Sequence, residues 1–212
     1  MKRRAFLAAS VPALLAACGA DNNWAPDDRV RAARYVSPEP PSVTLLTVIG
    51  IPRGDGGHTA LLINGSQRVI YDPAGSWMHP NLPERHDVWY GITDEIKNFY
   101  IDYHTRSNYW VAEDRLPVTR EVADIAIRRV EAQGPANKSF CAIESSRALQ
   151  GVPGFETAPV AWSPLRLRRW FLAQPGVQTR EWRDGDPRLV HSVRIQRKDG
   201  SFTGQAGAQP AM

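Results

Sequence analysis

Long apolar runs and cysteine are scarce in this sequence of 212 residues. No stretch approaches the roughly 18 apolar residues that a membrane-spanning helix needs, which excludes a multi-span membrane protein. Only two cysteines are present, Cys18 and Cys141, so each thiol has to be accounted for individually. Hydrophobic residues make up 42% and charged residues 23%, close to globular averages, and this composition excludes wholesale disorder.

An excess of charge of one sign is also nearly absent once the N-terminus is set aside. The formal net charge is +4, but Lys2, Arg3 and Arg4 supply three of the 26 basic residues. The basic residues that remain almost balance the 22 acidic ones. A body so nearly neutral gives no electrostatic reason to expect nucleic acid as a partner.

The N-terminus has the features of an export signal. The basic start is followed by a short apolar run with small residues at its end, which predicts a secretory signal peptide over residues 1–17. Arg3-Arg4-Ala5-Phe6-Leu7 resembles the twin-arginine export motif. The sequence from Leu15 to Gly19, LAACG, resembles the bacterial lipobox, in which the cysteine is acylated after cleavage before it. The alternatives are an ordinary signal peptide with an incidental Cys18, or a cytosolic start.

A lipidated Cys18 implies a location and a membrane contact. We expect a lipoprotein of the bacterial cell envelope that faces the periplasm, held to the membrane through its N-terminal lipid. Residues 18–42 are then the lipidated N-terminus and a flexible linker, because they hold a proline cluster at Pro38 to Pro41 and show no sustained periodicity. We expect a monomer.

The remainder predicts one α+β domain over residues 43–197 and a disordered tail over residues 198–212. Residues 73–92 are expected to form a long loop or functional flap. Short apolar runs bounded by turn residues predict strands at 43–51, 58–63, 67–72, 109–118, 177–182 and 189–196. Helical periodicity and capping residues predict helices at 93–104, 119–133, 140–149 and 163–173.

A histidine and a cysteine occupy positions typical of thiol catalysis. His58 begins a predicted strand directly after a glycine pair, and Cys141 lies in the first turn of a predicted helix. There the helix dipole favours the thiolate, and a neighbouring imidazolium would lower the thiol pKa further. A thiolate paired with histidine is the working unit of cysteine-based acyl transfer. The alternative interpretation of Cys141 is a small hydrophobic side chain buried in the core.

Two short motifs carry a family resemblance. GHTALLI around His58 and, later in the chain, FCAIESS around Cys141 resemble the circularly permuted papain-like superfamily, which includes NlpC-type and lecithin:retinol acyltransferase-like enzymes. The resemblance covers about residues 43–195. It implies an α+β fold with an antiparallel sheet packed with helices, in which the histidine strand precedes the cysteine helix. It also implies that Cys141 is the nucleophile, that His58 is the general base, and that a third polar residue orients the imidazole.

Asp72 is the preferred third residue, and Tyr71 is the alternative. A strict two-residue turn at Asn64-Gly65 would place Tyr71 opposite His58, whereas a three-residue loop through Ser66 would place Asp72 there. A carboxylate orients an imidazole and stabilises its cation better than a phenol does, so we expect Asp72. Many members of the superfamily use histidine, asparagine or glutamate at this place, and an aspartate departs from that pattern.

Two functions from different classes follow. The first is an envelope-anchored thiol hydrolase or acyltransferase acting on an amide or ester bond, in a peptidoglycan stem peptide or a lipid-linked acyl group. The second is a non-catalytic lipoprotein that uses the same fold to bind an envelope partner. No cofactor is expected. No metal site is expected either, because the other histidines lack metal-ligand spacing and are interpreted as loop or surface residues: His79, His86, His104 and His191.

Overall fold

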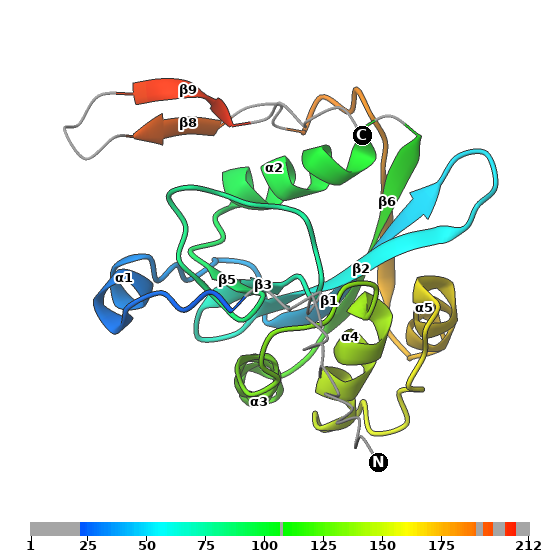
Figure 1. Ribbon diagram of the computed structural model, residues 1–212. Coiled ribbons are helices and arrows are strands. Elements are labelled where there is room, and N and C mark those ends of the chain that lie inside the picture. The colour runs from blue at the N-terminus through cyan, green and yellow to red at the C-terminus, as the bar shows by residue number, and fades with distance from the viewer. Residues whose placement is uncertain (1–21, 107, 190–192, 197–201, 207–212) are drawn as a thin grey trace, which may run out of the picture.

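The computed structural model describes residues 22–106, 108–189, 193–196 and 202–206 (Figure 1). The predicted signal peptide and Cys18 lie outside these residues. The described chain has the expected α+β fold, with an open antiparallel sheet of seven strands. None of its described helices is both long enough and apolar enough to cross a bilayer.

A buried strand forms the centre of the sheet. β1 (Ser42–Gly50) is apolar and β-branched almost throughout, and all nine of its residues are buried. It pairs antiparallel with β2 (Gly56–Asn64) on one side and with β6 (Tyr109–Pro117) on the other. The sheet order is β4-β5-β3-β2-β1-β6-β7, in which the outer strands are β3 (Arg68–Tyr71), β4 (Glu84–Arg85), β5 (Val88–Tyr90) and β7 (Gln178–Trp182).

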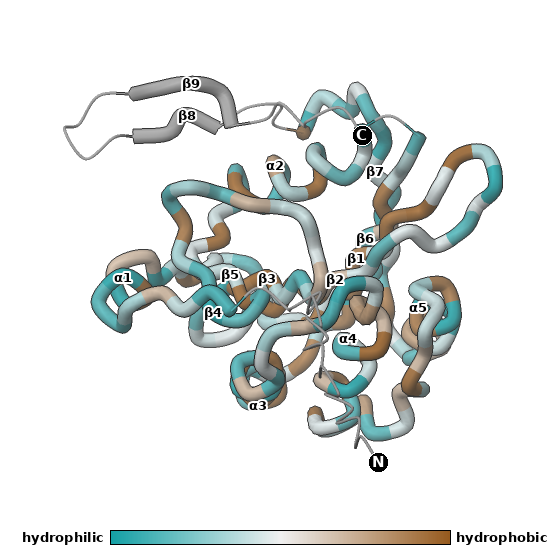
Figure 2. The backbone as a smooth tube through the Cα atoms, in the orientation of Figure 1, coloured by the Kyte–Doolittle hydropathy of each residue, from teal (hydrophilic) through white to brown (hydrophobic). Residues whose placement is uncertain are grey.

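Helices cover both faces of this sheet (Figure 1). α2 (Asp94–Thr105) packs on one face, and the opposite face carries α3 (Arg120–Glu131), α4 (Cys141–Gln150) and α5 (Pro164–Leu172). Threonine hydroxyls cap the first turns of α2 and α3. Hydrophobic and hydrophilic residues alternate along α3 and α5 (Figure 2), and the apolar stripe of each faces the sheet. The sheet therefore separates two hydrophobic cores, one under α2 and one under the other three helices.

Residues 22–41, expected as a flexible linker, instead dock on the domain. They include a short helix, α1 (Asp27–Ala32), beside the β4–β5 edge of the sheet (Figure 1). Trp24 forms a β-bridge with Arg85, whose Nε donates to the carbonyl of Ala25 over 2.7 Å. The guanidinium of Arg68, fully buried, donates to Ser37 Oγ. These contacts involve isolated residues, so no periodicity in the segment predicts them.

Two further segments also differ from expectation. Residues 73–92 are not wholly irregular, because β4 and β5 lie within them and extend the sheet beyond β3. The expected disordered tail contains β9 (Phe202–Ala206), which pairs with β8 (Val193–Gln196) in a separate two-stranded sheet. β4 and β5 are only two and three residues long. Such short strands are defined by the partner they pair with and carry too little pattern to be predicted.

Candidate active site

His58 lies on β2 beside an irregularity in the sheet. The pairing of β1 with β2 shifts between Val48 opposite His58 and Ile49 opposite Gly56, so Gly57 is an extra residue on β2. A bulge of this kind increases the local twist and redirects neighbouring side chains. A Cβ on Gly57 would come within 3.2 Å of the Tyr109 ring, which explains why a residue without a side chain precedes the histidine.

The connection between β2 and β3 sets the position of Asp72. Asn64 pairs with Arg68 and Leu61 pairs with Tyr71, so three residues, 65–67, join the two strands. Both registers considered from the sequence are wrong, because neither Tyr71 nor Asp72 lies directly opposite His58. Continuing the observed pairing by one residue aligns Asp72 with position 60 of β2. Positions 58 and 60 share one face of the sheet, so Asp72 is the diagonal neighbour of His58.

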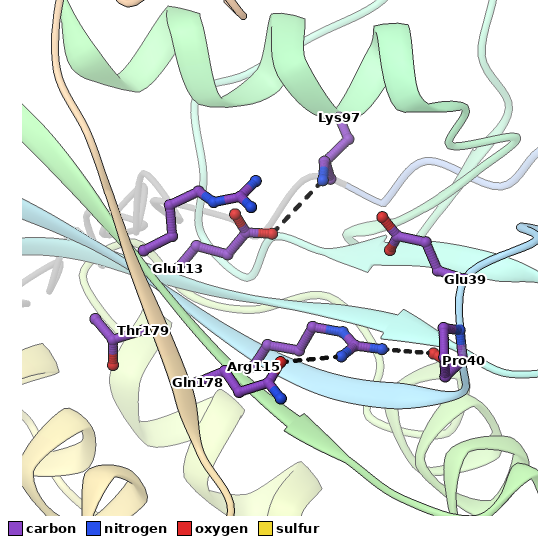
Figure 3. Close-up of a pocket in the computed structure, with 8 residues that line it drawn as sticks. Glu39, Pro40, Lys97, Glu113, Arg115, Gln178 and Thr179 are labelled. Carbon is purple, nitrogen blue, oxygen red and sulfur yellow. Dashed lines mark hydrogen bonds and ion pairs between the residues drawn. The ribbon is translucent and has the colours of Figure 1, made fainter.

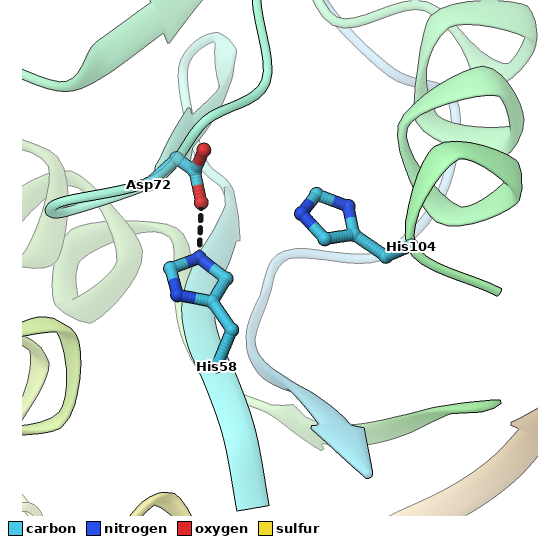
Figure 4. Close-up of side chains that lie close together, drawn as sticks. All are labelled: His58, Asp72 and His104. Atoms are coloured by element: carbon cyan, nitrogen blue, oxygen red, sulfur yellow. Dashed lines mark hydrogen bonds and ion pairs between the residues drawn. The ribbon is translucent and has the colours of Figure 1, made fainter. Parts of the chain in front are cut away.

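The two side chains meet across this diagonal. His58 Nε2 lies 2.6 Å from Asp72 Oδ1, and Figure 4 shows this hydrogen bond as a dashed line. Asp72 is 2% exposed. Tyr71, the alternative third residue, packs in the core on the opposite face, with Leu61 and Val69. The alternation of side chains along the strand therefore separates Asp72 from Tyr71.

Cys141 is the first residue of α4 and completes the cluster. The thiol lies close enough to the His58 ring for each group to shift the pKa of the other, and the backbone N–H groups of Thr59 and Ala142 also act on the thiol. Because His58 Nε2 is held by Asp72, the nitrogen that faces the sulfur is Nδ1. The structure thus brings Cys141, His58 and Asp72 together, although they come from α4, from β2 and from the residue after β3.

The electrostatics of the cluster favour a thiolate–imidazolium pair. Burial alone would lower the pKa of His58, but the Asp72 carboxylate, followed by the Cys141 sulfur, outweighs it and raises that pKa to about 10. Burial likewise opposes ionisation of Cys141, yet the hydrogen bond and positive charge of His58 lower the pKa of the thiol below its ordinary value. The same imidazolium lowers the pKa of Asp72 against its burial. Each charge stabilises its neighbour.

Two residues of α2 also belong to the site, although neither was predicted from the sequence. Tyr100 donates its hydroxyl proton to Asp72 Oδ1 over 2.7 Å, and the His104 ring stacks on the His58 ring with centroids 5.7 Å apart (Figure 4). The interpretation of His104 as a loop or surface residue is therefore wrong. The available signal was their spacing of four residues within a predicted helix, which puts both on one face.

His104 is neutral in this environment. Burial is the main cause that lowers its pKa, to about 4. Its Nδ1 lies 2.8 Å from the carbonyl oxygen of Tyr100. A carbonyl only accepts, so Nδ1 carries the proton and Nε2 is left as an acceptor. His104 and His58 line a cleft of about 270 Å³, together with small residues from 74–76, Tyr103 and Tyr109.

The same side chains raise the question of a metal ion. His58, Asp72 and His104 offer ligand atoms that all lie within 4.8 Å of one another. Two ligands of one tetrahedral zinc ion, each bonded at about 2.1 Å, would be roughly 3.4 Å apart. His58 Nε2 and Asp72 Oδ1 are 2.6 Å apart, a hydrogen-bonding distance. The geometry therefore fits a hydrogen-bonded pair better than two ligands of one ion.

A second cavity, of about 280 Å³, lies between α2, β6 and β7 (Figure 3). It is lined largely by charged and polar side chains, but many of these pair with one another. Lys97 lies 3.6 Å from Glu113, which also accepts from the indole of Trp182. Arg115 donates to the carbonyl of Pro40. Because these charges are already paired, the cavity has no group comparable with the thiol at the first site.

Two other described histidines lie apart from the cluster. His79 is in a loop, as expected, but is buried rather than exposed, and burial lowers its pKa. His86 follows β4 and bonds to Asn22. His191 lies outside the described residues.

Comparison with protein-family models, with curated proteins and with solved structures finds no match to this chain. Function is therefore inferred from the geometry around Cys141.

Proposed function

We propose that this chain is an envelope-anchored thiol hydrolase or acyltransferase that acts on an amide or ester bond. The observation that carries the proposal is the convergence of three groups: the Cys141 thiol interacts with the His58 ring, and that ring is hydrogen-bonded to Asp72. Three separate segments converge to make it, and a cysteine that merely fills space in the core needs no such partners. The antiparallel sheet, with its histidine strand before its cysteine helix, supports a permuted papain-like arrangement.

The chemistry follows from the positions of the protons. The Cys141 thiolate attacks the carbonyl carbon of the substrate, and the electron pair of the C=O bond moves to oxygen. The tetrahedral intermediate then collapses, and His58 Nδ1–H gives its proton to the departing nitrogen or oxygen. Water or an acceptor hydroxyl next loses a proton to His58 and attacks the thioester, which restores the thiolate–imidazolium pair. Asp72 holds the ring and stabilises its cation throughout.

The start of α4 suits the oxyanion that forms in the first step. N–H groups in the first turn of a helix have no carbonyl partner within that helix, and the helix dipole is positive there. Cys141 is itself the first residue of α4, so its own backbone N–H is the donor nearest to the reacting carbon. We assign this N–H to stabilisation of the oxyanion.

The location proposed for the enzyme depends on Cys18. A lipid on this residue would hold the domain at a bacterial membrane, facing the periplasm, where the substrate classes are peptidoglycan stem peptides and lipid-linked acyl groups. Mass spectrometry of the mature N-terminus tests this part. The expected species begins at Cys18 and carries acyl chains, whereas an intact Met1 or a free Cys18 thiol would contradict it.

Alkylation of Cys141 tests the catalytic part. Iodoacetamide should label Cys141 in the folded protein near pH 6, where a free thiol with a pKa of about 8.5 is almost entirely protonated. His58→Ala should remove most of this labelling. A native protein that labels only after unfolding would favour the non-catalytic binding lipoprotein instead. Circular dichroism of the variant separates loss of the imidazole from loss of the fold.

A further inference from the structure

A bare apolar surface lies at the end of the domain where the described chain begins. Trp24 is 59% exposed and Met78 is 79% exposed, although both are large hydrophobic side chains. They line one broad hollow of about 540 Å³, whose other apolar members are Ala25, Pro26, Pro80, Leu82, Pro83 and Trp89. We call this surface the Trp24 face. Exposed apolar surface of this kind, rimmed by polar groups, marks contact with a partner or a membrane.

Trp24 is held in its exposed position. Its segment is attached to β4 through the bridge to Arg85 and through a bond from the N–H of Ala25 to the carbonyl of Glu84. The Arg85 guanidinium lies over the indole, 4.6 Å from the ring centroid. The guanidinium therefore covers one side of the indole, while Trp24 as a whole remains 59% exposed. A tryptophan with one apolar and one polar side suits the boundary between water and lipid.

The short chain between Cys18 and the Trp24 face indicates what covers this face. Asn22 is the first described residue and is four residues from Cys18. A fully extended chain of four residues spans at most about 14 Å. If Cys18 carries acyl chains inserted in a bilayer, as the proposed function requires, Asn22 stays within that distance of the anchor.

We propose that the Trp24 face rests on the lipid bilayer to which the chain is anchored. The inference depends on the proposed function only for the anchor at Cys18. Ser76 lines the cleft that holds His58, and Met78 follows two residues later on the Trp24 face. The segment 76–78 therefore joins the cleft that holds His58 to the proposed membrane contact.

Vesicle co-sedimentation tests the membrane contact without the lipid anchor. The protein to use is the mature chain, residues 18–212, with Cys18→Ser, because it contains every element that the structure describes. The vesicles are phosphatidylcholine alone, or with phosphatidylglycerol to reveal a charge contribution. We expect the protein to co-sediment, and we expect Trp24→Ala with Met78→Ser to weaken partitioning by about fivefold or more, since each side chain loses apolar burial.

Leu172→Ser is the matched control, because Leu172 is a 42% exposed apolar residue at the end of α5, away from the Trp24 face. It should leave partitioning unchanged. The proposal would be overturned if the protein with an intact Trp24 face did not bind vesicles. It would also be overturned if Leu172→Ser weakened partitioning as much as the double substitution does. A dimer in solution that the double substitution dissociates would overturn it too, since a second copy would then be the occupant. Low-pH labelling of Cys141, measured on the same variants, reports separately on the proposed catalytic function.

Discussion

Replacing Asp72 by asparagine tests the electrostatic basis of the site. The pKa of His58 is raised from 6.5 to about 10. At 1.36 kcal/mol for each pKa step, the imidazolium is favoured by roughly 5 kcal/mol relative to the free side chain. The Asp72 carboxylate is the main favourable cause. Asparagine keeps the shape, and its amide oxygen still accepts from His58 and Tyr100, so the substitution removes charge while leaving the geometry in place.

Without that charge, burial dominates. The pKa of His58 should then fall to its ordinary value or below it, because burial is the largest single cause acting on this group. Cys141 would lose the imidazolium that lowers its own pKa. A thiol with a pKa of about 8.5 is roughly 0.3% ionised at pH 6. The rate of Cys141 alkylation at pH 6 should therefore fall by about 100-fold or more, and recover as the pH rises through 8.5.

The assay is the pH profile of iodoacetamide labelling, with the modified cysteine identified by peptide mass spectrometry. Asp114→Asn provides the control, because Asp114, on β6, is also fully buried but pairs with Arg168 of α5 rather than with His58. It should leave the labelling profile unchanged even if it reduces stability. An Asp72→Asn protein that is folded and alkylates at pH 6 as fast as wild type would refute the reasoning.

Three further outcomes follow from the same contacts. Tyr100→Phe removes one hydrogen bond to the Asp72 carboxylate, so denaturant unfolding should show a loss of about 1–3 kcal/mol, with a smaller effect on labelling than Asp72→Asn has. Gly75→Ala places a Cβ in steric overlap with the Asp72 carboxylate; it should displace the carboxylate and reduce labelling at pH 6 in a protein that circular dichroism shows to be folded. Burial raises the pKa of Asp87 to about 6 from 3.8, so this group stabilises the fold below pH 3.8 and loses that contribution as pH rises through 6. Urea titrations should therefore show Asp87→Asn gaining up to about 3 kcal/mol relative to wild type between pH 4 and 7, and a constant difference would contradict this.

The amino-acid sequence by itself determined most of the longer elements of the domain and which cysteine is proposed as the nucleophile. The continuous apolar, β-branched run of β1 predicted a buried strand, and the apolar stripe of α3 predicted an amphipathic helix; the structure has both. Both signals are local, because side-chain periodicity depends only on backbone geometry. Cys141 at the start of a helix and His58 after a glycine pair were visible for the same reason.

The tertiary structure decided what surrounds these two residues. Register cannot be obtained from β2 and β3 separately, and the pairing that formed made Asp72 a diagonal neighbour of His58 rather than its opposite. Tyr100 and His104 entered the site because α2 packs on the face of the sheet that carries His58. The docking of residues 22–41 likewise depends on single contacts to Arg85 and Arg68. Such contacts join residues far apart in the chain, so only the packed fold specifies them.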